Sequence, residues 1–325
     1  VDPQARLADR KLLLAAAERH LPGVLAERAR ELIAQLGSAA APLALDGARV
    51  LWEDEPVAAL RPGRSVLTPQ LALDDSLSAL APGQRVEIEA ALGRWLDGTL
   101  AALQPLHALH HASTDAAGGP ELRALLIRLV EAGGMLPRQD SGLDRLDKIQ
   151  RDRLRRLGVT VGALDLFMPA MLKPAALGAW RTLLAVRGTV IPAPVPTMPP
   201  VVALAGKAPP PPGYRALGRQ AIRMDIAEKL LRLAHGARVA AGSKPFVLDP
   251  ALAVSTGLST LAYAQLLRLG GFTATVPRPL ADGQFGPPRP PLWRWRPVRR
   301  EEPASGQPAT APASGAFAAL ADLVR

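Results

Sequence analysis

The stretch FVLDPALAVSTGLSTLAYAQLLRLGGFTATV, residues 246–276, carries the clearest fold signals of the chain. Asp249-Pro250 is a good N-cap and first-turn proline for one helix, and Ser259 is placed to cap a second helix. Gly270-Gly271 ends the second helix, and the β-branched and aromatic residues at both ends of the stretch predict short strands. The pattern predicts a helix-turn-helix with a wing.

The segments around this stretch predict the boundaries of a small domain. Upstream, a strand over 221–223 leads into a helix with a capping-box pattern at Asp225 and Glu228. Before it, IPAPVPTMPPVVALAGKAPPPPG (191–213) is proline-dense and predicts a semi-extended linker. We therefore expect a small α+β, winged-helix-like domain over 214–277.

The rest of the chain is dominated by helical patterns. Residues 1–112 predict a helical domain with a β-hairpin near 48–60, and residues 113–190 predict a second helical domain. Residues 278–325 are rich in Pro, Arg, Gly, Ser and Ala, which predicts a largely disordered tail with a short terminal helix. The predicted fold class is mainly α: a multi-helix body with a small hairpin, the α+β domain and the tail.

Composition excludes several protein classes. The 325 residues are 48% hydrophobic but only 4% aromatic, and none is cysteine, so disulfides and thiolate metal sites are excluded. No run approaches the roughly 20 apolar residues of a membrane span, and the polar start is not a signal peptide. We expect no membrane partner and a cytoplasmic location. A start at Val1 rather than Met suggests a fragment.

The net charge of +10 is concentrated toward the C-terminal end. Residues 1–110 carry 11 basic and 14 acidic side chains, residues 111–190 carry 12 and 8, and residues 191–325 carry 16 and 7. This asymmetry points to a polyanionic partner. The alternative is codon bias of a GC-rich genome, since 33 of the 39 basic residues are arginine.

One candidate nucleic-acid contact is the predicted helix over 143–157. A basic stripe recurs there at helical spacing and could follow a phosphate backbone; its members are Arg145, Lys148, Arg151 and Arg155. The alternative is an exposed helix stabilised by acid-to-base pairs four residues apart, for which Asp144, Asp147 and Asp152 are suitably placed.

Two more candidates combine aromatic rings with arginines, a combination that suits single-stranded nucleic acid. The first places Tyr214 beside three arginines, Arg215, Arg219 and Arg223. The second is LWRWRPVRR (292–300), which contains Trp293, Arg294, Trp295, Arg296, Arg299 and Arg300. The alternatives are a plain domain edge for the first and, for the second, a strand whose tryptophans pack on the third domain.

Signatures of catalysis are missing from the sequence. Gly206-Lys207 lacks the earlier glycine and the following Ser or Thr of a phosphate-binding loop, and no Gly-x-Ser-x-Gly elbow occurs. His107, His110 and His111 could share a helix face and hold zinc, but exposed histidines at a helix end are the simpler interpretation. We expect no catalytic residue, metal or cofactor in this chain.

A short apolar stripe near the end of the sequence predicts a docking helix over 314–325. Phe317, Leu320 and Val324 lie at i, i+3 and i+7. Because so short a helix is unstable alone, it should order only against a partner or the body of the protein.

Three stretches together resemble a known family. They are LRRLGVTVGALDLFMPAMLKP (154–174), GYRALGRQAIRMDIAEKLLRLA (213–234) and FVLDPALAVSTGLSTLAYAQLLRLGGF (246–272). In this order, they resemble the C-terminal half of bacterial DExH-type superfamily II helicases, alphaproteobacterial relatives of the mitochondrial RNA-degradosome helicase. Residues 43–104 and the GAFAALADL ending are similar to the same region.

The resemblance implies an accessory region that guides unwound RNA or DNA next to an upstream motor. The family's motor consists of two RecA-like domains that use ATP and magnesium, and none of its motifs occurs here. The leading hypothesis is therefore a nucleic-acid-binding C-terminal region of an ATP-dependent helicase. The alternative is a docking module for a protein such as a nuclease, and a metal-dependent hydrolase built on His107 is a third class.

Overall fold

A computed structural model of the chain describes residues 3–36, 42–189, 197–206, 208–275, 286 and 290–296. These residues form nine α-helices and thirteen strands, and the strands assemble into four small antiparallel sheets. The fold is therefore mixed helix and sheet, and the predicted mainly α class is wrong. Most of the missed strands have only two to four residues, too few to show an alternating pattern.

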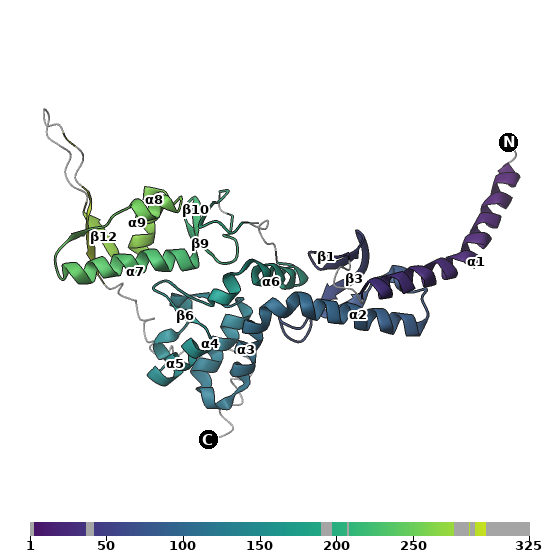
Figure 1. Ribbon diagram of the computed structural model, residues 1–325, viewed down its shortest axis with the longest axis horizontal. Helices are drawn as coiled ribbons and strands as arrows, with labels where there is room; N and C mark the ends of the chain where they lie inside the picture. Colours follow the sequence, from purple (N-terminus) through teal and green to yellow (C-terminus); the bar gives the residue numbers. More distant parts are fainter. Residues whose placement is uncertain are drawn as a thin grey trace, which may run out of the picture.

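The longest helices are α1, α2 and α7, and Figure 1 shows α7 in the C-terminal module, far from α1. The bounds of the helices are α1 Pro3–Leu36, α2 Pro82–Leu100, α3 Gln104–Thr114, α4 Gly119–Glu131, α5 Lys148–Arg156, α6 Pro174–Val186, α7 Met224–Ala241, α8 Ala251–Ser255 and α9 Thr260–Leu269.

The strands pair into sheets of order β1-β2-β3-β4, β5-β7-β6, β8-β10-β9 and β11-β13-β12. Their bounds are β1 Leu43–Asp46, β2 Arg49–Trp52, β3 Glu55–Arg61, β4 Gln70–Leu73, β5 Met135–Pro137, β6 Thr160–Val161, β7 Asp165–Phe167, β8 Val201–Ala203, β9 Tyr214–Leu217, β10 Gln220–Arg223, β11 Phe246–Val247, β12 Phe272–Thr275 and β13 Leu292–Trp295.

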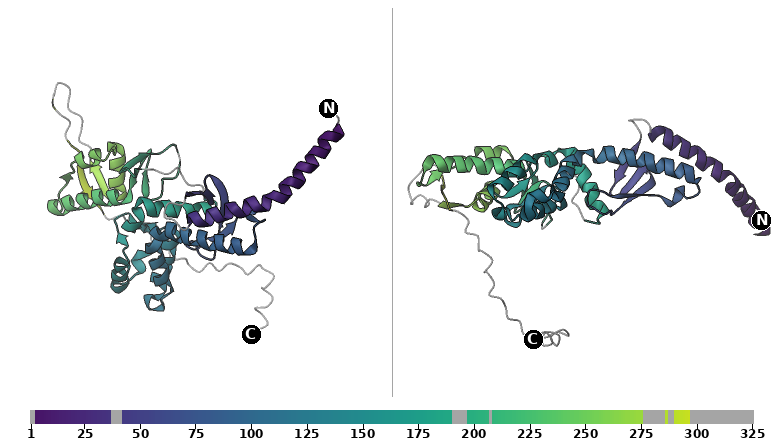
Figure 2. Two further views of the ribbon diagram at one scale, coloured as in Figure 1. Left: turned by 45° about the vertical axis from the view of Figure 1, so that its right-hand side comes forward. Right: turned by 90° about the horizontal axis from the view of Figure 1, so that it is seen from below.

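The largest hydrophobic core extends from Ala29 to Leu183. It joins the end of α1, the first sheet and helices α2, α3, α4 and α6, so residues on both sides of the predicted boundary at 112/113 share one core. Figure 2 shows the first part of α1 extending away from this body. The division of the chain into domains stays a prediction.

A second core belongs to the C-terminal module. It joins helices α7, α8 and α9 to the sheet β11-β13-β12, and it includes Trp293. Residues 292–295 are thus a central strand, whereas the sequence placed them in a largely disordered tail. The alternative interpretation of these residues, a strand that packs on the third domain, agrees with the structure at Trp293, whose side chain is buried in the core.

Two further local predictions need correction. Val201–Ala203, within the predicted linker, forms strand β8 and pairs with β10; it is an edge strand, where flanking prolines are tolerated. The capping box at Asp225 does not form, because Glu228 accepts a hydrogen bond from the Ala163 backbone amide instead.

The two cores are joined through the loop that precedes β7. Arg215 of β9 donates to both carboxylate oxygens of Asp165, at 2.7 and 2.5 Å, and to the Leu164 carbonyl at 3.2 Å. Asp165 is only 5% exposed. This buried ion pair, together with the contact between Glu228 and Ala163, fixes the C-terminal module against the larger body.

Candidate nucleic-acid interface

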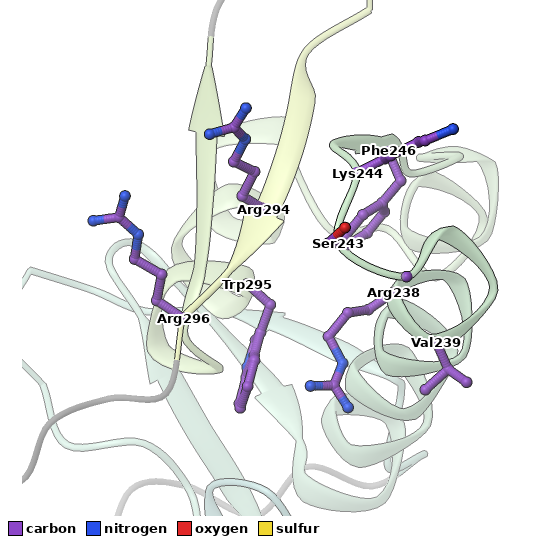
Figure 3. Close-up of a pocket in the computed structure, with 9 residues that line it drawn as sticks. Arg238, Val239, Ser243, Lys244, Phe246, Arg294, Trp295 and Arg296 are labelled. Carbon is purple, nitrogen blue, oxygen red and sulfur yellow. The ribbon is translucent and has the colours of Figure 1, made fainter.

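A basic pocket of about 310 Å³ opens beside strand β13 (Figure 3). It lies between the C-terminal end of α7, the loop that leads to β11, and the end of β13. Its lining residues are Arg238, Val239, Gly242, Ser243, Lys244, Phe246, Arg294, Trp295 and Arg296. Four of them are cations and none is acidic, so the pocket favours an anion.

The short length of β11 leaves part of β13 open at the pocket. On one side β13 pairs with β12 over all four residues, from Leu292 to Trp295. On the other side β11 pairs only with Leu292 and Trp293. The edge of β13 beyond Trp293 therefore faces the pocket, and Arg294 and Arg296 are exposed there.

Strand alternation separates the tryptophans of β13 from its arginines. Trp293 pairs with Phe246 and Ala274 on the face that packs into the core. Arg294 and Arg296 extend to the side opposite Trp295, as Figure 3 shows. The run therefore does not form a single surface of alternating rings and cations.

Trp295 positions a third cation from helix α7. The guanidinium carbon of Arg238 lies 4.3 Å from the Trp295 ring centroid, a cation–π contact. The indole Nε1 donates to the Gly270 carbonyl at 3.0 Å, which fixes the ring. The Arg238 Nε is buried and has no hydrogen-bond partner among the described residues. The Trp295 ring therefore orients Arg238, and the Arg238 guanidinium already covers one face of the ring.

Gly271 allows the close approach that holds Trp295. Its φ of +87° lies in the left-handed region, and a Cβ there would lie 3.0 Å from the Trp295 Nε1 and 2.6 Å from the Arg296 carbonyl oxygen. The glycine that ends α9 therefore also permits the turn against β13.

His235 lies one helical turn before Arg238 and packs on the same aromatic cluster. Its ring centroid is 4.9 Å from that of Phe272 and 5.7 Å from that of Trp295. Burial, aided by the charge of Arg238 and opposed by Glu228, lowers the pKa of His235 below its ordinary value of 6.5. The imidazole is therefore neutral at pH 7, which avoids a second charge beside Arg238.

The four cations of the pocket lack acidic partners. In the described part of the chain, no ion pair involves Arg238, Lys244, Arg294 or Arg296. Their mutual repulsion is unrelieved by carboxylates from the described residues, and a bound polyanion would relieve it.

The predicted group around Tyr214 is mostly committed to the fold. Tyr214 is buried and donates to the Pro199 carbonyl at 2.7 Å, so its ring is not free to stack on a base. Arg215 pairs with Asp165, and Arg223 pairs with Asp225 and donates to the Met198 carbonyl. Hydrogen bonds to the Asp225 carboxylate raise the pKa of Arg223 above its ordinary value. Arg219 alone of the three arginines is exposed.

The predicted basic stripe lies on two elements. Arg145 ends a short 3-10 turn over Leu143–Arg145, whereas Lys148, Arg151 and Arg155 belong to α5. The helix begins later than expected because Asp147 and Gln150 form a capping box, with Gln150 N 2.7 Å from the Asp147 carboxylate. Asp152 pairs with Arg155 at 2.7 Å, which partly neutralises the stripe.

Other predicted residues add nothing to this interface. Arg299, Arg300 and the docking stripe of Phe317, Leu320 and Val324 lie outside the described residues. Among the described residues, no group of three His, Asp or Glu side chains could hold a metal ion, the histidines of α3 included. None of the described helices combines the length and apolarity that crossing a membrane requires.

Arg238 and Lys244 were not recognised from sequence. Both belong to ARVAAGSKP (237–245), where cations near a helix end are ordinary. Their role depends on β13, about 50 residues further along the chain. The pairing of β13 with β11 and the contact between Arg238 and Trp295 bring the two segments together.

Comparison of the chain with protein-family models, with curated proteins and with solved structures finds no match.

Proposed function

We propose that this chain binds single-stranded RNA or DNA at the basic pocket of β13, and that it is the accessory C-terminal region of an ATP-dependent superfamily II helicase. The observation that supports the proposal is the gathering of Arg238, Lys244, Arg294 and Arg296 around one open strand edge with no acidic lining residue.

The chemistry of the pocket suits a phosphate backbone. A guanidinium offers a planar fork of donors that matches phosphate oxygens, and lysine adds a mobile point charge. Arg294 and Arg296 lie on one side of β13 and Arg238 on the other, so a strand that crosses the open edge could meet cations on both sides (Figure 3). Such contacts neutralise charge without reading sequence.

The helicase assignment rests on the family resemblance of the three stretches quoted above. Under it, RecA-like domains upstream would supply ATP and magnesium chemistry, and this chain would guide the strand in the cytoplasm. A nuclease could dock on the same region. Those parts of the proposal are tested by the reading frame upstream of Val1, where RecA-like motifs are expected.

Binding is tested by fluorescence anisotropy with a labelled single strand of about ten nucleotides, at several salt concentrations. Each lost phosphate contact should reduce the slope of log K against log salt by about 0.7. We expect this for Arg238→Gln, Arg294→Gln and Arg296→Gln. The matched control is Arg85→Gln, an exposed position on α2 with the same change of charge.

Two results would overturn the proposal. One is an equal effect of Arg85→Gln and the three pocket variants, because the binding would then depend on overall charge alone. The other is the absence of strand binding together with salt-tolerant capture of a protein partner, which would favour the docking module.

A further inference from the structure

A second cationic pocket lies in the larger core, away from β13. Its volume is about 410 Å³, and it lies where the loop between β3 and β4, helices α3 and α4 and the end of α6 meet. Three arginines from three different segments line it: Arg64 from the loop, Arg123 from α4 and Arg187 just after α6. This pocket shares no lining residue with the basic pocket beside β13.

Arg64 is held at the pocket by a tightly built loop. A Cβ at Gly63 would lie 1.9 Å from the Thr68 carbonyl oxygen, so only glycine permits this turn. The Ser65 hydroxyl accepts from the Leu67 amide at 3.3 Å, and the side chain of Val66 is buried in the core. The backbone that carries Arg64 is therefore fixed, so that on binding an anion only the Arg64 side chain has to be ordered.

Within the described residues, Arg123 is oriented by one hydrogen bond. Its Nε donates to the Ser113 carbonyl at 3.0 Å, and the Ser113 hydroxyl donates to the His110 carbonyl at 2.6 Å. This arrangement ties the end of α3 to α4 and leaves the terminal NH₂ groups of Arg123 for a ligand. Since α3 and α4 pack side by side, the tie is rigid (Figure 1).

The charges of the pocket are unbalanced. Glu131 is the single acidic residue among those that line it, against three guanidinium groups. In the described part of the chain, no ion pair forms between Glu131 or any other carboxylate and the three arginines. Three cations that line one pocket without carboxylate partners favour a ligand of more than one negative charge.

Part of the pocket wall is apolar. Val66 and Val130 are buried, and Ile127 of α4 is 45% exposed at the pocket. A ligand with a compact dianion at one end and a flat or apolar group at the other would use both surfaces. The volume is within the range of small-ligand sites, roughly 300–1,000 Å³.

We propose that this pocket binds a terminal phosphomonoester of a nucleotide, with Arg64, Arg123 and Arg187 around the phosphate and the nucleoside against Ile127. A phosphomonoester carries about two charges and three terminal oxygens, which suits a pocket lined by three guanidinium groups. A diester inside a strand has one charge and two free oxygens. The phosphomonoester could belong to a free mononucleotide or to the phosphorylated end of a strand.

The test is calorimetric titration of the full chain with AMP, with adenosine as the uncharged control. Wild type should bind AMP more tightly than adenosine. Arg64→Gln, Arg123→Gln and Arg187→Gln should each weaken AMP binding about tenfold, because each removes hydrogen bonds to a charged group. Arg94→Gln, an exposed position on α2, is the matched control and should bind AMP like wild type.

Glu131→Gln gives an effect of the opposite sign, because it removes the single negative charge of the pocket. AMP should then bind several-fold more tightly, and this variant decides the question if Arg123→Gln unfolds. Equal affinity for AMP and adenosine in wild type, or no change in Arg64→Gln and Glu131→Gln, would overturn the proposal.

The source of the phosphate is distinguished with two ten-nucleotide strands, one with a 5′-phosphate and one with a 5′-hydroxyl. A preference for the phosphorylated strand that Arg64→Gln abolishes identifies a strand end as the ligand. Equal binding of the two strands, with AMP binding retained, identifies a free mononucleotide. Because the pocket is separate from β13, AMP binding should persist in Arg294→Gln.

Discussion

The two tryptophans of β13 show how neighbouring residues of one type acquire different roles. Trp293 is 5% exposed and lies between Phe246 and Ala274. Trp295 has the same orientation but lies at the end of the strand, where α7 supplies Arg238 in place of core atoms. The first tryptophan is a packing residue, and the second supports the basic pocket.

Replacement of each tryptophan by alanine should therefore have a distinct result. Trp293→Ala should lower the free energy of unfolding by about 3–5 kcal/mol, the cost of removing a buried aromatic ring. Trp295→Ala should cost less stability, and it should weaken strand binding because Arg238 loses its support. Chemical denaturation and anisotropy measure the two effects. A greater loss of stability in Trp295→Ala than in Trp293→Ala would contradict this assignment.

His235 predicts a pH dependence of stability. Its pKa in the folded chain lies below the value of about 6.5 expected when unfolded, so the unfolded state binds the proton more readily. Its contribution to stability is complete above pH 6.5 and is lost as the pH falls through 6.5 toward the lower pKa of the folded state. His235→Gln should lose less stability than wild type between pH 7.5 and pH 5. The exposed His111→Gln serves as the control, and matching pH profiles of wild type and His235→Gln would contradict the prediction.

At the scale of elements, α5 is defined by its cap more than by its charges. The reciprocal contacts of Asp147 and Gln150 satisfy two free backbone amides at the helix start. Asp147→Ala should therefore lower the free energy of unfolding by about 1 kcal/mol. Asp152→Ala breaks only the exposed ion pair with Arg155 and should cost less than about 0.5 kcal/mol. Equal effects in thermal denaturation would mean that the cap is unimportant.

Helices with strong local signals could be predicted from the sequence. Ser259 accepts a hydrogen bond from the Ala262 amide at the start of α9, and the helix ends at Leu269, before the two glycines. The short strands β10, β11 and β12 were also predicted, but β8 and β13 were not, because they depend on partners that lie about 20 residues away or more. The three residues of β8 and the four residues of β13 carry almost no periodic signal of their own, and both lie in proline-rich sequence.

At the scale of the whole molecule, the contacts that organise the chain join residues far apart in sequence. Asp165 and Arg215 are separated by 50 residues, and Glu228 reaches an amide 65 residues earlier. The basic pocket likewise needs α7 and β13 together. The arginines of 292–300 stand out in the sequence because they are clustered. Arg215 and Arg223 were also predicted to contact nucleic acid. The local sequence pattern could not show that Asp165 and Asp225 already form ion pairs with them.

The ion pair between the two cores yields the last prediction. Asp165 is almost completely buried and the side chain of Arg215 is 20% exposed, so removal of one partner leaves the other charged and desolvated. Asp165→Asn should lower the free energy of unfolding by about 3–5 kcal/mol. Asp225→Asn, which weakens the more exposed pair with Arg223 inside one module, is the matched control and should cost less.

A double replacement separates the charge from the packing at this junction. Asp165→Leu combined with Arg215→Met removes both charges and keeps apolar volume, so it should recover much of the stability that Asp165→Asn loses. Limited proteolysis should cut Asp165→Asn within 197–213 faster than wild type or the double variant, because the C-terminal module would separate from the larger body. Wild-type stability and cleavage rate in Asp165→Asn would show that the ion pair is not needed to hold the two cores together.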